Sequence, residues 1–182
     1  MNKLIFERPA KWNALRYKQV YNHELFSDML FEEYTEFKDA KTTADKLDGL
    51  ADLFFISVGA LWKLKANSYD YICDSIDEYA LLEELGDFHT GKELTLIVTK
   101  IIENTEANTL KRLITYLIEI IFKEFIYLNC REDQAELAIL IVCDSNDTKK
   151  VGVIHESYKG DLKGNNYISP DKRLSLLAEV IE

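Results

Sequence analysis

The feature that most constrains the fold is a helical repeat of large apolar residues. Within residues 43–65 they recur at spacings of three and four, as Leu47, Leu50, Phe54, Val58 and Leu61. This spacing places them on one face of an α-helix, which must be buried against other elements. The chain of 182 residues holds only 7 Gly and 2 Pro, so few turns are encoded and long helices are favoured. The sequence therefore predicts one all-α domain over residues 1–182, a helical bundle.

Capping residues and breaks in the apolar pattern place the expected helices. Pro9 is expected in the first turn of the first helix, Ser27 or Asp28 at the start of the second, and Pro170 at the first position of the last. A short loop or hairpin is expected between Asp144 and that last helix. The expected ranges are 9–21, 28–40, 43–65, 71–85, 93–103, 105–129, 132–142 and 170–180, with a break at 86–91.

Composition and charge exclude several classes of function. Hydrophobic residues make up 47% of the chain, which suffices for a core, and the net charge of −10 would repel nucleic acid. The apolar stretch at 113–128 contains Glu119, Lys123 and Glu124, so a buried helix is expected there and no membrane span. Three scattered cysteines and no apolar leader favour reduced thiols and a cytoplasmic location. We therefore expect neither a nucleic-acid partner nor a membrane partner.

Acidic residues recur on two consecutive expected helices. Glu32, Glu33 and Glu36 lie on one of them, and Asp48 and Asp52 lie four residues apart on the next. The connection between the helices is short, so they should pack antiparallel with their acidic stripes facing each other. Such carboxylates repel unless cations neutralise them, and Mg²⁺ prefers oxygen ligands. The alternative is a solvated helix face, which the apolar neighbours of Asp52 argue against.

Other catalytic signatures are absent from the sequence. No P-loop, nucleophile elbow or dinucleotide-binding glycine pattern occurs, and no Glu-x-x-His pair is present. The histidines, His23, His89 and His155, are isolated, and we expect none of them to bind a metal.

The acidic pattern resembles that of the all-α NTP pyrophosphohydrolases, which include MazG-like proteins, dimeric dUTPases and phosphoribosyl-ATP pyrophosphohydrolase. That family carries EExxE on one helix and ExxD on the next. Residues 32–36 read EEYTE, and residues 48–52 read DGLAD, with Gly49 where the family has Glu. The resemblance implies Mg²⁺, or Mn²⁺ in its place, on four carboxylates, and a water-activating role for Glu32. The implied metal ligands are Glu33, Glu36, Asp52 and, as the substitute fourth, Asp48.

Two later segments resemble the phage-type branch of the same family, which carries SNxSK and then KGxxYxxPD. Here residues 145–149 read SNDTK, and residues 163–171 read KGNNYISPD. The resemblance implies that these segments bind substrate, with lysines on the phosphates and the tyrosine stacked on a base or ribose. A plain polar hairpin is the alternative. The implied substrate-binding residues are Asn146, Lys149, Lys163, Asn166 and Tyr167.

The sequence thus leads to one expected function and two alternatives. The expected function is hydrolysis of an NTP, a dNTP or a phosphoribosyl-ATP-like nucleotide between its α- and β-phosphates. The fold would be a MazG-like bundle assembled as a homodimer or homotetramer, with residues 66–135 as a helical insertion, and a phage or prophage role would be plausible. One alternative is a degenerate member that binds nucleotide without turnover, because the family's Glu is missing at Gly49. The other is a non-enzymatic helical interaction protein.

Overall fold

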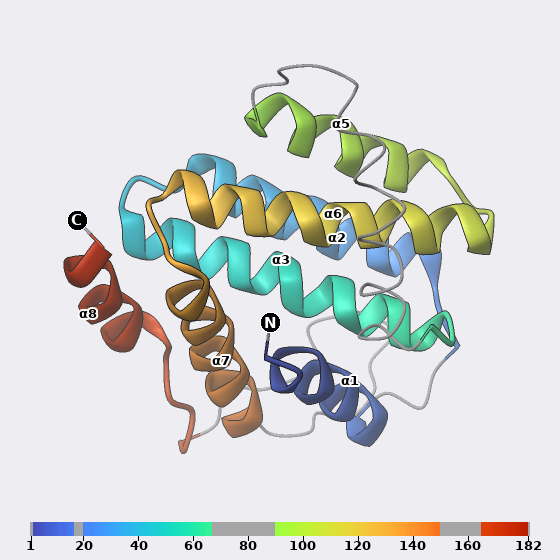
Figure 1. The fold of residues 1–182 in the computed structure, drawn as a ribbon. Coiled ribbons are helices and arrows are strands. Elements are labelled where there is room, and N and C mark those ends of the chain that lie inside the picture. The colour runs from blue at the N-terminus through green and yellow to red at the C-terminus, as the bar shows by residue number, and fades with distance from the viewer. Residues whose placement is uncertain (1, 17–19, 67–89, 150–164, 182) are drawn as a thin grey trace.

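The fold is known from a computed structural model that describes residues 2–16, 20–66, 90–149 and 165–181 (Figure 1). Within these ranges the chain forms helices and no strands, so the predicted all-α class is confirmed for the described residues. The expected helix at 71–85 lies outside them, as do Cys73, His89, His155 and Lys163. The described helices are α1 (Leu4–Arg16), α2 (His23–Asp39), α3 (Thr43–Lys63), α5 (Thr90–Glu103), α6 (Ala107–Tyr127), α7 (Glu132–Thr148) and α8 (Asp171–Ile181).

Helix α3 runs through the middle of the bundle (Figure 1) and packs against α1, α2, α6, α7 and α8. It begins where expected, because the Thr42 side chain accepts a hydrogen bond from the Asp45 N–H at 3.1 Å. The five apolar residues whose spacing predicted this helix are all 0% exposed. A helix that is buried on so many sides has a nearly continuous apolar sequence, and α3 has such a sequence after Asp52.

The other helices surround α3 and share one core. Helix α2 packs on α3 after a three-residue connection, α6 packs on α3, and α5 covers α6 and α2. Helix α7 packs on α3 and α1, and α8 packs on α3 and α7. Every described helix contributes buried side chains to a single cluster, including α5 and α6 through Leu94, Ile101, Ile114 and Phe125. Part of the stretch expected as an insertion therefore belongs to the core. None of the described helices is long and apolar enough to cross a membrane.

Three helices begin before their expected first residues. Helix α1 begins at Leu4, so Pro9 lies inside it, because Ile5 and Phe6 are buried and draw the preceding turn into the helix. Helix α2 begins at His23, because the Asn22 side chain accepts from the Leu25 N–H. Helix α5 begins at Thr90 and includes Gly91, which was expected in a break.

The later helix ends also differ in part. Helix α7 continues to Thr148, six residues beyond its expected end at Val142, so the expected loop does not begin at Asp144. Pro170 precedes α8, and its carbonyl accepts from the Leu174 N–H. It therefore occupies the N-cap position, one residue before the expected one.

Two glycines of α3 mark close approaches between helices. A Cβ atom at Gly49 would lie 2.9 Å from both Cα and Cβ of Phe37 on α2. A Cβ atom at Gly59 would lie 2.5 Å from Nδ2 of Asn13 on α1, which confirms the close packing expected there. The contact at Gly49 includes backbone, which cannot rotate away, so α2 and α3 can pack at this distance only with glycine at position 49.

Candidate functional site

The two aspartates of α3 lie within the electrostatic reach of the acidic residues of α2. Burial raises the pKa of Asp52 well above its usual value, and the negative charges of Glu33, Asp48 and Glu36 raise it further. Burial likewise raises the pKa of Asp48 to about 6, with Asp171, Glu36 and Asp45 adding to the rise. The four carboxylates predicted as metal ligands thus act on one another electrostatically, as expected when α2 packs on α3.

Asp48 carries a buried oxygen atom that is chemically unsatisfied. Its Oδ1 is inaccessible to solvent and has no hydrogen-bond partner among the described residues. A buried carboxylate oxygen without a partner costs free energy, and a cation is one way to offset that cost. The donor set consists of carboxylate oxygens, which are the ligands that Mg²⁺ prefers. On these observations the residues fit a hard divalent cation.

The positive charge of Lys149, which is distant in sequence, acts on the same two aspartates. Lys149 follows the last residue of α7 as its C-cap, and its charge lowers the pKa of both Asp48 and Asp52. Helix α7 packs directly on α3. The end of α7 thus lies within electrostatic reach of two aspartates about a hundred residues earlier in the sequence, and both segments had been singled out for the same site.

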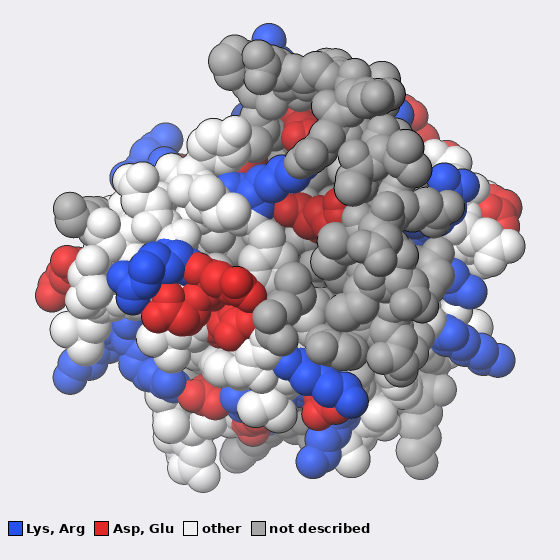
Figure 2. All heavy atoms as spheres, viewed as in Figure 1, with Lys and Arg blue, Asp and Glu red and all other residues white. Residues whose placement is uncertain are grey.

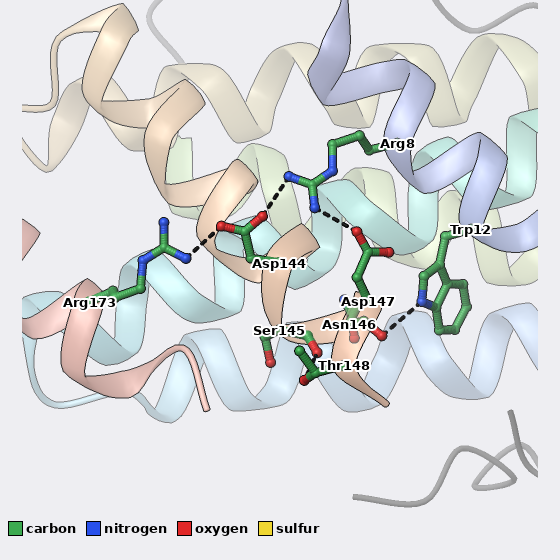
Figure 3. Close-up of polar contacts among 8 residues, drawn as sticks. All are labelled: Arg8, Trp12, Asp144, Ser145, Asn146, Asp147, Thr148 and Arg173. Carbon is green, nitrogen blue, oxygen red and sulfur yellow. Dashed lines mark hydrogen bonds and ion pairs between the residues drawn. The ribbon is translucent and has the colours of Figure 1, made fainter. Parts of the chain in front are cut away.

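Residues 145–148 form the last turn of α7 and not a loop, which corrects the expectation for this segment. Their groups make contacts within the protein (Figure 3). The Trp12 indole N–H donates to the Asn146 carbonyl at 3.0 Å, and Arg8 pairs with Asp147 at 2.6 Å. The Thr148 hydroxyl donates to the Ser145 carbonyl at 2.7 Å. The helix continues past Asp144 because α1 satisfies these groups from one side.

The remaining predicted site residues have different surroundings. Asn146 is 4% exposed, Asn166 is exposed, and Tyr167 is partly buried, with its hydroxyl accepting from the Ser145 hydroxyl at 3.2 Å. Glu32 lies beside Glu33 on α2 and is partly exposed. Lys163 lies outside the described residues. The roles expected of these five residues remain predictions.

A series of ion pairs next to this region was not predicted from the sequence. Asp144 pairs with Arg8 at 2.8 Å and with Arg173 at 2.5 Å, which links α1, α7 and α8 (Figure 3). Partial burial opposes ionisation, but hydrogen bonds from the two arginines hold the pKa of Asp144 below its usual value. Figure 2 shows acidic and basic side chains gathered side by side on the face formed by α7 and α8. No spacing rule connects these residues, since they pair across as many as 139 positions.

Within the described ranges, no three His, Cys, Asp or Glu side chains are already arranged to hold one metal ion. Comparison of the chain with family models, with curated proteins and with solved structures gives no match. What the site does must therefore be argued from its own residues.

Proposed function

We propose that this protein is a Mg²⁺-dependent nucleotide pyrophosphohydrolase with a MazG-like bundle, which cleaves an NTP, a dNTP or a related nucleotide to a monophosphate and pyrophosphate. The observation that carries this proposal is that the positive charge of Lys149 acts on the two aspartates that also interact with the acidic residues of α2. Carboxylates alone would bind a cation, and a lysine alone would bind an anion. The two together are suited to a metal-bound phosphate chain.

Glu33, Glu36, Asp48 and Asp52 would hold the metal. Mg²⁺ bound there would polarise a phosphoryl oxygen and neutralise the charge that develops in the reaction. Burial and neighbouring carboxylates raise the pKa values of Asp48 and Asp52, and a bound cation would favour their ionised forms. Gly49 supports Asp48, and not position 49, as the fourth ligand, because any side chain at 49 would meet the backbone of α2.

The chain's other groups would position the nucleotide and the water. Lys149 and Lys163 would bind phosphate oxygens, and Glu32 would accept a proton from the attacking water. The water oxygen then bonds to the α-phosphorus, the bond from that phosphorus to the bridging oxygen breaks, and pyrophosphate leaves with the electron pair. Asn146, Asn166 and Tyr167 would contact the remainder of the nucleotide. A homodimeric or homotetrameric assembly and a phage-type role belong to the same proposal.

The experiment is to measure pyrophosphate and monophosphate formation from a panel of NTPs and dNTPs, with Mg²⁺ or with EDTA. Mg²⁺-dependent release of both products in equal amounts is expected. Asp52→Asn and Lys149→Ala should lower kcat/KM, by about a hundredfold or more where a metal ligand is removed. Glu179→Gln, which removes an exposed charge from α8, serves as the matched control. Turnover that survives Asp52→Asn would refute the metal assignment.

A second candidate function is nucleotide binding without turnover. The observation that favours it is the closed packing at Gly49, which removes from the site one side chain that the family pattern supplies. No product from any nucleotide, together with Mg²⁺-dependent binding of a nucleotide, would support this candidate over the hydrolase.

A further inference from the structure

The backbone carbonyl of Asn146, in the last turn of α7, accepts hydrogen bonds from two donors. The indole N–H of Trp12 on α1 donates to it at 3.0 Å (Figure 3), and the backbone N–H of Lys149 donates to it at 3.1 Å. Lys149 is the C-cap of α7, so the backbone of Lys149 is bonded to the same oxygen atom that Trp12 holds. The position of Trp12 therefore influences where Lys149 lies.

Trp12 is itself fixed against α3. Its side chain is 9% exposed, and its ring meets the ring of Phe55 edge-on, with 5.3 Å between the ring centroids. Phe55 lies on α3 three residues after Asp52, about one helical turn away. The indole has a single donor, and packing against Phe55 fixes the direction in which that donor points. Trp12 thus connects the end of α7 to the part of α3 that carries Asp52.

Arg8, one turn before Trp12 on α1, binds the last two turns of α7 as well. Its guanidinium pairs with Asp144 at 2.8 Å and with Asp147 at 2.6 Å (Figure 3). These side chains are partly exposed, so the ion pairs are screened by solvent, whereas the hydrogen bond of Trp12 is buried. Helix α1 therefore holds the end of α7 mainly through Trp12, with support from Arg8.

We propose that Trp12 is a positioning residue of the nucleotide site, which with the support of Arg8 holds Lys149 where its ammonium group binds the phosphate chain. This inference rests on the proposed function, because it assigns the phosphates to Lys149. A lysine side chain is long and flexible, and ordering it on binding costs affinity. Fixing the backbone from which the side chain starts lowers that cost. Trp12 acts through Lys149 and not by touching the nucleotide.

The test measures the affinity of the full chain for inorganic pyrophosphate in the presence of Mg²⁺ by isothermal titration calorimetry. Trp12→Phe keeps an aromatic ring beside Phe55 and removes the N–H donor, so it should weaken binding about two- to tenfold. Lys149→Ala should weaken binding at least as much. The double variant should bind no more weakly than Lys149→Ala, because Trp12 has no effect once the lysine is gone.

Trp62→Phe is the matched control. It makes the same exchange on α3, ten residues after Asp52 and about 15 Å along the helix, and should keep the wild-type affinity. If Trp12→Phe does not fold, Arg8→Gln takes its place in the same cycle with Lys149→Ala, and the same loss that is not additive is expected.

A purely structural role of Trp12 would lower Tm and leave the affinity for pyrophosphate unchanged, which would overturn the inference. Additive losses in the double variant would also overturn it, since Trp12 would then act independently of Lys149. If the wild type binds no pyrophosphate, the phosphate-binding role of Lys149 fails and this inference fails with it, while product formation from nucleotides judges the hydrolase separately. If Lys149→Ala weakens binding and Trp12→Phe does not, the Trp12 assignment alone fails.

Discussion

Replacement of Gly49 by alanine tests the contact that sets the distance between the two acidic helices. The added methyl carbon would lie 2.9 Å from Cα and Cβ of Phe37 and 3.2 Å from its backbone nitrogen. Because these atoms include backbone, relief requires α2 and α3 to move apart. Overpacking of this kind typically costs about 1–3 kcal/mol. Alanine recovers about 1 kcal/mol through its higher helix propensity.

The net expectation is a loss of about 0–2 kcal/mol in the free energy of unfolding, toward the upper part of this range because the contact includes backbone atoms. The chain offers a matched control in Gly91, which also lies in a helix but has nothing within 4 Å of an added Cβ. Gly91→Ala should leave stability unchanged or raise it by up to about 1 kcal/mol. The two substitutions are chemically identical, so their difference isolates the contact with Phe37.

Urea unfolding followed by far-UV circular dichroism, in EDTA and at neutral pH, measures both variants. The reasoning is refuted if Gly49→Ala is as stable as the wild type or more so. Measuring the Tm of the same variant at increasing Mg²⁺ concentrations adds a functional test. Because α2 and α3 would lie further apart, the rise in Tm caused by Mg²⁺ should be smaller than in the wild type. Gly49→Glu, which would restore the family pattern, should destabilise further and add no ligand, since its side chain would point at the backbone of α2.

Three further predictions concern single groups. In EDTA, Asp48→Asn should raise stability above pH 6, because a pKa of about 6 against 3.8 in the unfolded chain represents up to about 3 kcal/mol. The wild type should lose that stability as pH rises from about 4 through 6, since its folded state keeps the proton longer, and urea unfolding across this range checks both. Trp12→Phe should cost about 1 kcal/mol in the same assay by removing the indole donor from the Asn146 carbonyl, which keeps its bond from the Lys149 N–H. Asn22→Ala should cost about 1 kcal/mol through loss of the α2 cap, which thermal unfolding would show.

The helices with strong apolar periodicity could be predicted from sequence, and those set by distant contacts could not. Helix α3 begins and ends within two residues of its expected range because both its cap and its buried face are local features. Helix α7 extends beyond its expected end because Trp12 and Arg8 of α1 satisfy its last turn. Polar residues at a helix end look like a loop when the partners that bind them lie far away in sequence.

The same distinction between local features and distant contacts applies to the candidate site. The acidic pairing of α2 with α3 could be foreseen, because a three-residue connection and spacings of three and four fix which residues face each other. The effect of Lys149 on these aspartates could be expected only through resemblance, and the ion pairs of Asp144 with Arg8 and Arg173 were not predicted. These pairs join α1, α7 and α8, and no local pattern encodes such a tertiary arrangement.

The contacts between α1 and the end of α7 also bear on how the chain folds during synthesis. Arg8 and Asp147 are separated by 139 positions, and Trp12 and Asn146 by 134. At about 5–20 residues per second, α1 waits on the order of ten seconds for its partners to leave the ribosome. Helix α3 is made much earlier, and Phe6 can pack on its Phe54 during that interval. Loop closure over the longer separation is slow, so the contacts of α1 with α7 are expected to form late, after α1 has packed on α3.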